Sequence, residues 1–230
     1  MNGYQKIDSY TLMRDGLKHI MYELNQQRPN LFRIGKEAYN FLYRSMTEAL
    51  LGGNPDNVTY EASTKRDKHR THIYQLGSSP WQKIKKQKIK GCKTLWRYSQ
   101  PVQYIEPTFK DNDIRKEPSN QKLLPFDEML AMIQTDCCMR RYYHSKPILI
   151  SDDEMQTLDW LHTQVRNEFE HFTPKGYLVG KDSLVNSSAL ALKVARELLH
   201  ESGTVIPLRS RPGRRLLDCL IRKIHQQERK

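Results

Sequence analysis

Apolar residues recur every three or four positions in several stretches of the chain, and this spacing is typical of amphipathic helices. Asn30 is the expected N-cap of one such helix, and the stretch GGNPDN at 52–57 ends it. The stripes predict helices over residues 8–25, 31–51, 183–201 and 213–228, with a further helix from Pro125 to about Tyr143.

The stretch from 151 to 172 is predicted to be a helix with a well-specified start. Ser151 and Glu154 stand at the two positions of a capping box, and Ile150 and Met155 stand at those of a hydrophobic staple. Pro174 cannot continue the backbone hydrogen-bond ladder, so the helix is predicted to stop before it. The apolar stripe of this helix consists of Met155, Leu158, Leu161, Val165, Phe169 and Phe172.

The segment 58–121 differs from the predicted helices in composition and hydrophobic pattern. It contains short β-like pieces at 71–76 and 101–106, scattered Pro and Gly, and an exposed loop at 111–122. No convincing long helix stands out, although 79–98 has the composition to form one. The predicted fold class is mainly α, a bundle of about five helices. We expect one domain over 1–230, with an irregular, partly β basic insertion at about 58–121 and a basic C-terminal helix at about 205–230.

The net charge and its distribution make this predicted helical bundle a candidate for binding a polyanion. The chain has 38 basic and 26 acidic residues, a net charge of +12. Residues 61–100 hold eleven basic and two acidic side chains, and 205–230 hold eight and two. By contrast, 151–170 hold six acidic side chains and one basic one. Positive charge concentrated in segments favours a nucleic-acid partner, although lysine-rich surfaces also simply keep proteins in solution.

Aromatic and basic residues interleave within the insertion. Aromatic rings stack on unpaired bases, and lysines contact phosphates. Equally open is the alternative that the aromatic side chains, Tyr98 included, are buried beneath a solvated lysine face. The predicted nucleic-acid-binding set is Trp81, Lys83, Lys85, Lys86, Lys88, Lys90, Lys93, Trp96 and Arg97.

The sequence predicts no metal site, no cofactor and no disulfide framework. Its four cysteines lack zinc-ligand spacing, and the adjacent Cys137 and Cys138 are interpreted as small buried apolar residues. The N-terminus lacks the apolar core of a signal peptide, and no apolar run has the length of a membrane span. We therefore expect a cytoplasmic protein that does not contact a membrane.

Arg166, Asn167 and His171 form the pattern Arg-Asn-x-x-x-His late in the predicted helix 151–172. At about 100° per residue, with Val165 at zero, they lie at about 100°, 200° and 240° around the helix axis. Asn167 and His171 then point away from the core and are neighbours one turn apart. His162, at about 60°, is interpreted as a packing residue. A solvated helix face and a catalytic set both explain this pattern.

On this acidic-capped helix, followed by another apolar helix, the pattern resembles the signature of the HEPN superfamily (higher eukaryotes and prokaryotes nucleotide-binding domains). The resemblance covers roughly 8–51 and 123–201, and it leaves the insertion and the tail unexplained. It implies a HEPN-like helical bundle and a metal-independent endoribonuclease of toxin or antiviral-defence type, with Arg166, Asn167 and His171 as catalytic residues.

The same resemblance implies RNA as substrate, a homodimer in which the two signatures face each other, and an antitoxin or regulatory protein as a further partner. Cleavage of RNA without a metal uses the substrate's 2′-OH and needs a base, an acid and a cation. Histidine suits acid–base work because its unperturbed pKa, about 6.5, lies near neutral pH. Some family members only bind, so the alternative is a non-catalytic helical module that binds nucleic acid or a partner protein.

Overall fold

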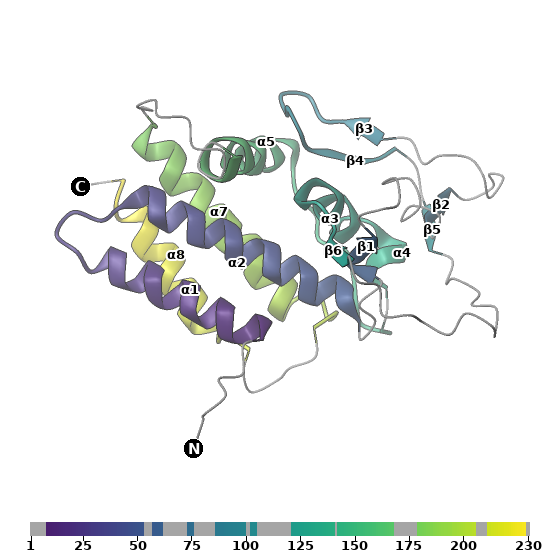
Figure 1. Cartoon of the computed structure of the whole chain (residues 1–230), viewed down its shortest axis with the longest axis horizontal. Coiled ribbons are helices and arrows are strands. Elements are labelled where there is room, and N and C mark those ends of the chain that lie inside the picture. Colours follow the sequence, from purple (N-terminus) through teal and green to yellow (C-terminus); the bar gives the residue numbers. More distant parts are fainter. Residues whose placement is uncertain are drawn as a thin grey trace, which may run out of the picture.

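A computed structural model of the 230-residue chain shows a mainly α-helical protein, as the sequence predicts (Figure 1). Helices fill the core, and the strands of the described residues lie in short pairs at one side of it (Figure 1). The structure describes residues 8–52, 57–61, 73–75, 86–99, 102–104, 121–140, 142–167, 179–205 and 211–228.

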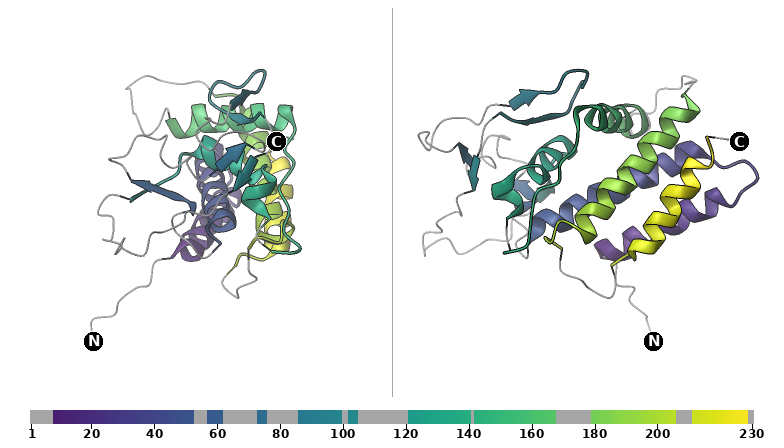
Figure 2. Two further views of the ribbon diagram at one scale, coloured as in Figure 1. Left: turned by 90° about the vertical axis from the view of Figure 1, so that its right-hand side faces the viewer. Right: turned by 180° about the vertical axis from the view of Figure 1, so that it is seen from behind.

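Four long helices form the centre of the molecule: α1 (Ser9–Leu24), α2 (Leu31–Leu51), α7 (Lys181–His200) and α8 (Arg214–His225). Each contacts two of the others, in the cycle α1–α2–α7–α8 (Figure 2). The buried apolar side chains between them form a shared core. Gly35 lets α2 and α7 approach closely, because a Cβ there would lie 3.3 Å from Ser188 Oγ. The side chains fully buried in this core include Met13, Ile20, Ile34, Phe41, Leu42 and Met46.

The predicted ends of the first two helices are confirmed. Asp8 caps α1 by accepting from the backbone N–H of Thr11 at 2.8 Å. Asn30 caps α2 by accepting from the N–H of Arg33 at 3.0 Å, and Gly52 closes α2 in the left-handed conformation at φ 50°. Local chemistry therefore determines where these helices begin and end.

The single helix expected from Pro125 to about Tyr143 is wrong, because the chain forms α3 (Phe126–Ile133) and α4 (Asp136–Met139) instead. The carbonyl of Ile133, which a continuing helix would pair with residue 137, accepts from the N–H of Ile148 at 3.0 Å. Thr135 between the two helices is extended, at φ −108° and ψ 124°. A backbone contact with a segment fifteen residues further on thus interrupts the helical pattern.

The helix predicted over 151–172 begins as expected but changes type. It runs as α5 (Asp152–Trp160) and continues as a π-helix, η3 (Leu161–Asn167), where the described part ends. The stripe residues Met155, Leu158, Leu161 and Val165 are buried, as predicted. Phe169, Phe172 and the stop at Pro174 lie outside the described residues.

The described strands form three antiparallel pairs, each of three residues per strand: β1 (Thr59–Glu61) with β6 (Gln121–Leu123), β2 (Ile73–Gln75) with β5 (Val102–Tyr104), and β3 (Lys86–Lys88) with β4 (Trp96–Tyr98). The β-like pieces predicted at 71–76 and 101–106 contain β2 and β5, and the structure shows that these strands pair with one another. The helix considered over 79–98 is wrong for its described part, which is a β-hairpin.

Candidate functional site

The N-terminus of α5 is fixed both locally and by α7. Ser151 Oγ accepts from the N–H of Glu154 at 3.2 Å, and the Glu154 carboxylate accepts from the N–H of Ser151 at 3.0 Å. The predicted capping box is therefore confirmed. The other carboxylate oxygen of Glu154 accepts from Lys193 of α7 at 2.8 Å. Burial alone would raise the pKa of the Glu154 carboxyl, but the hydrogen bonds from Lys193 and Ser151 outweigh it and lower that pKa.

The first part of the Arg-Asn-x-x-x-His pattern lies on the π-helix. Backbone hydrogen bonds from i to i+5 widen this helix, so the angles expected from 100° per residue do not hold beyond Trp160. Arg166 is half-buried near the end of the π-helix. Asn167 is its last residue, and its side chain, like the whole of His171, lies outside the described part of the chain.

His162 holds the π-helix against α2 and α3. Its Nδ1 lies 3.1 Å from the hydroxyl of Tyr39, and its ring stacks on Phe126 with centroids 4.9 Å apart and planes at 11°. The Tyr39 ring lies on it at 5.7 Å and 24°. The side chain is buried, so the interpretation of His162 as a packing residue is confirmed. Leu161 packs beside Gly35 of α2, because a Cβ added at Gly35 would lie 3.7 Å from Cδ1 of Leu161.

Asp159, which sequence analysis missed, anchors the β3–β4 hairpin to α5. Its side chain is 4% exposed. One carboxylate oxygen accepts from the N–H of Lys93 at 2.7 Å. The other accepts from the N–H and hydroxyl of Thr94, at 2.9 and 2.6 Å, and from the N–H of Leu95 at 3.0 Å. Burial by itself would raise the pKa of this carboxyl, but these hydrogen bonds outweigh it and lower the pKa, so Asp159 is ionised at neutral pH.

A sequence signal for this anchor exists. The acidic residues of the first turn, Asp152 to Glu154, are explained by the capping box and the helix dipole. Asp159 lies too far along the helix for that explanation and directly follows the buried Leu158. A carboxylate beside an apolar stripe, without a helix-end role, needs buried donors. Which donors it finds cannot be seen in the sequence, because they lie 64 to 66 residues away.

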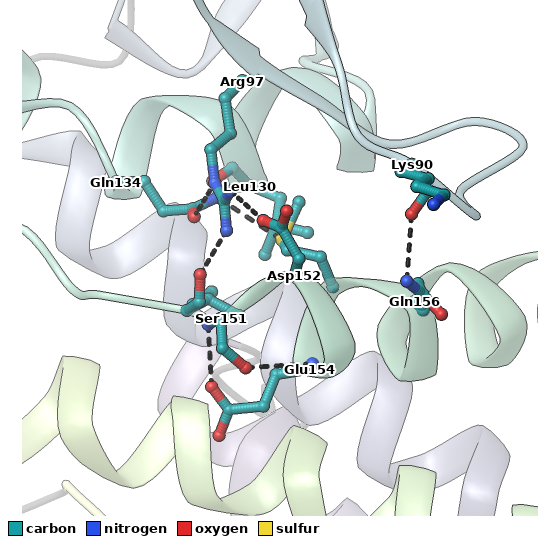
Figure 3. A network of polar contacts seen from close by, with 10 residues as sticks. Lys90, Arg97, Leu130, Gln134, Ser151, Asp152, Glu154 and Gln156 are labelled. Atoms are coloured by element: carbon teal, nitrogen blue, oxygen red, sulfur yellow. Dashed lines mark hydrogen bonds and ion pairs between the residues drawn. The ribbon is translucent and has the colours of Figure 1, made fainter.

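Further contacts hold the hairpin in the corner between α3 and α5 (Figure 3). The guanidinium of Arg97 donates to Gln134 at 2.9 Å, to the carbonyl of Ile150 and to Asp152. Gln156 donates to the carbonyl of Lys90 at 3.0 Å.

Two further hydrogen bonds connect the hairpin to α3, and its turn packs against α5. The indole of Trp96 donates to Asp127 at 3.0 Å, and the hydroxyl of Tyr98 donates to Glu128 at 3.0 Å. Gly91, at φ 86°, lies directly over the Gln156 side chain, which is 2.7 Å from where a Cβ would be. The hairpin therefore packs as part of the fold.

The structure separates those predicted nucleic-acid-binding residues that it describes into two groups. Trp96 is 5% exposed and Arg97 uses its guanidinium on internal acceptors, so the alternative of buried aromatics beneath a lysine face describes this region better than base stacking does. Lys88, Lys90 and Lys93 are exposed, and so is Lys86, whose ammonium lies 3.9 Å from the centre of the Trp96 ring. Trp81, Lys83 and Lys85 lie outside the described residues.

Two further properties concern the described ranges only. No group of three or more His, Cys, Asp or Glu side chains there is placed to hold a metal ion. None of the helices in those ranges has the length and apolar character that a membrane crossing requires.

Comparisons of the chain with protein-family models, curated proteins and solved structures give no match. The functional conclusion therefore depends on the chemistry of the residues themselves.

Proposed function

We propose that the protein is a metal-independent endoribonuclease whose catalytic residues are Arg166, Asn167 and His171. The observation that supports this proposal is the place of the pattern: it begins on a π-helix, a rare conformation often found at functional sites. On that π-helix Leu161, His162 and Val165 are buried, while Arg166 is half-buried. An arginine held on a firmly packed turn is suited to binding a phosphate with little loss of conformational freedom.

The reaction would use the substrate's own 2′-hydroxyl. Its oxygen attacks the neighbouring phosphorus as a base removes its proton, the bond from phosphorus to the 5′-oxygen breaks, and an acid protonates that oxygen. The products are a 2′,3′-cyclic phosphate and a 5′-hydroxyl. His171 supplies the acid–base group. Arg166 stabilises the charge on the phosphorane through its planar fork, and Asn167 orients His171 or contacts the phosphate.

A homodimer completes this chemistry. One imidazole cannot easily act as base and as acid on opposite sides of the same phosphorus, whereas His171 from each of two copies divides the work. This arrangement suits a toxin or defence effector, since a partner protein that blocks the dimer interface would hold the enzyme inactive.

The decisive experiment is incubation of the purified protein with RNA in the presence of EDTA. We expect cleavage to continue and to leave 2′,3′-cyclic phosphate ends, and a substrate with a 2′-deoxy sugar at the cleavage position to resist it. His171→Ala should lower the rate by about 10²–10⁴-fold, the usual contribution of a general acid or base. His225→Ala, on the exposed surface of α8, is the matched control and should cut RNA at the parental rate.

The role of Arg166 is tested by Arg166→Lys, which keeps the charge but removes the two-pronged geometry. We expect a loss of rate with the fold intact by circular dichroism. Parental rates in both Arg166→Lys and His171→Ala would overturn the mechanism.

A second candidate function is RNA binding without cleavage, and the exposed lysines of the β3–β4 hairpin favour it. Binding that weakens steeply with salt, together with intact RNA after incubation, would support this function over the nuclease.

A further inference from the structure

The hairpin between Lys86 and Tyr98 concentrates positive charge in a short segment. Its thirteen residues include five basic side chains, Lys86, Lys88, Lys90, Lys93 and Arg97, and no acidic one. Arg97 points inward to Asp152 and Gln134, and the other four are exposed. Among the described residues, no ion pair involves Lys88, Lys90 or Lys93.

The contacts that hold the turn of the hairpin use its backbone and leave its ammonium groups in solvent. The buried carboxylate of Asp159 accepts from the backbone N–H of Lys93, while the side chain of Lys93 stays exposed. Gln156 likewise binds the carbonyl of Lys90, whose side chain is also exposed. An acidic residue placed to neutralise the lysines would lie beside their ammonium groups. Asp159 instead fixes the turn and leaves the charge available to a partner.

The backbone that carries the lysines is held in place as well. Lys86 lies over the ring of the buried Trp96, and Trp96 is tied to Asp127 of α3. Lys86 and Lys88 are two residues apart on one strand, so their side chains leave the same face of it. A row of cations on a backbone that tertiary contacts hold in place binds a polyanion at a lower ordering cost than the same cations on a free segment.

Asp159 also connects this row to the proposed catalytic residues. It lies seven residues before Arg166 on one continuous helical segment, a distance on the order of 10 Å along the helix axis. A polyanion bound along the lysines would therefore be held near the part of the segment that carries Arg166. RNA has the required regular spacing of phosphates and is the substrate of the proposed reaction.

We infer that Lys86, Lys88, Lys90 and Lys93 form a ridge that binds the phosphate backbone of RNA, held in position on α5 by Asp159. The inference of this lysine ridge depends on the proposed function only for the identification of RNA as the partner. It contacts phosphates and leaves the bases unread, so binding is expected to be insensitive to sequence. Asp159 acts as a positioning residue, since it fixes the ridge and touches no RNA.

The first test removes charge from the ridge. Binding of a fluorescent, unstructured RNA oligonucleotide is measured by anisotropy over a range of salt concentrations for Lys88→Ala/Lys90→Ala/Lys93→Ala. We expect the slope of log affinity against log salt to fall by about 2, because each of three lost phosphate contacts on a single strand removes about 0.7. The matched control, Lys18→Ala/Lys36→Ala/Lys146→Ala, loses the same charge from exposed positions elsewhere. Equal slopes in the two triple variants would overturn the ridge.

The second test separates position from charge. Asp159→Asn makes the protein more positive, so a purely electrostatic surface would bind RNA more tightly. If Asp159 positions the ridge, binding becomes weaker and amide hydrogen exchange in residues 86–98 becomes faster. Asp153→Asn, at an exposed residue of the same helix, makes the same charge change and should neither weaken binding nor speed exchange in residues 86–98. Tighter binding by Asp159→Asn would overturn the positioning role, and the triple lysine variant tests the ridge even if Asp159→Asn folds poorly.

One control identifies the partner, and the choice of readouts separates this inference from the proposed nuclease activity. Polyglutamate is added as a competitor at the same charge concentration as the RNA. Equal displacement would assign the ridge to an acidic protein and overturn the RNA assignment. Since every readout here is binding or exchange, a ridge that binds RNA in a protein without cleavage would disprove only the nuclease. RNA cleavage by a protein whose RNA binding does not depend on the ridge lysines would disprove only this inference.

Discussion

The two halves of the helical segment from Asp152 to Asn167 differ in what holds them. The first half, α5, begins with a capping box made by residues three apart in the chain. The second half, the π-helix, is held by Tyr39 of α2 and Phe126 of α3, which lie far from it in sequence. The start of the first half is therefore specified by its own sequence, whereas the second half takes its form from its neighbours. The proposed catalytic Arg166 lies in the second.

The largest expected effect comes from removing core packing at the start of the π-helix. Leu161→Ala should cost about 2–5 kcal/mol of unfolding free energy, measured by denaturant titration, because Leu161 is fully buried. Leu158→Ala in the regular half is the matched control, with an equally buried side chain. Both should lose stability, but only Leu161→Ala should speed hydrogen exchange selectively at 162–167. Equal acceleration there by Leu158→Ala would mean that the two halves are a single unit.

A smaller effect is expected at the locally determined end. Ser151→Ala removes the capping box and should cost about 1 kcal/mol. Hydrogen exchange should rise in the first turn of α5 and stay unchanged at 161–167. Ser183→Ala, an exposed serine in the first turn of α7, should change stability by less than about 0.5 kcal/mol. A response of the π-helix to Ser151→Ala would contradict the independence of the two halves.

Tyr39→Phe tests the tertiary contact of the π-helix with the smallest structural change. The ring that stacks on His162 remains, and the hydroxyl that lies 3.1 Å from its Nδ1 is lost. We expect a loss of about 0.5–1.5 kcal/mol in thermal or chemical unfolding. Tyr22→Phe is the control, since Tyr22 is 63% exposed. Equal stability of the two variants would show that stacking alone holds His162.

The smallest effect is expected on acidification and is confined to the hairpin. Hydrogen bonds lower the pKa of Asp159 in the folded protein, so its contribution is complete above the pKa of an unfolded aspartate, about 3.9. That contribution is lost as pH falls through the lower folded-state pKa. The NMR signals of the Lys93, Thr94 and Leu95 amides should titrate together, with a midpoint below about 3.9. A midpoint above that value would mean that the hydrogen bonds do not stabilise the ionised form of the Asp159 carboxyl group.

How much of the site the sequence predicts depends on where the partners of each residue lie. The caps at Asn30 and Ser151 were predicted because donor and acceptor are three residues apart. The break between α3 and α4 was not, because it depends on the backbone of Ile148. Asp159 was not assigned a role for the same reason. The buried state of Trp96 was left open, since a pattern of aromatic and basic residues is equally consistent with a covered ring and an exposed one.

The sequence alone determined the mainly α class, the capped starts of α2 and α5 and the positive charge of the 86–98 segment. Those properties depend on spacing, on residues three or four apart and on composition, all of which can be read along one chain. Only the tertiary structure decided that the helix after Trp160 is π and that the 86–98 segment is a hairpin fixed by Asp159. A buried carboxylate and a buried imidazole must find hydrogen-bond partners, and the packing of distant segments determines which ones they find.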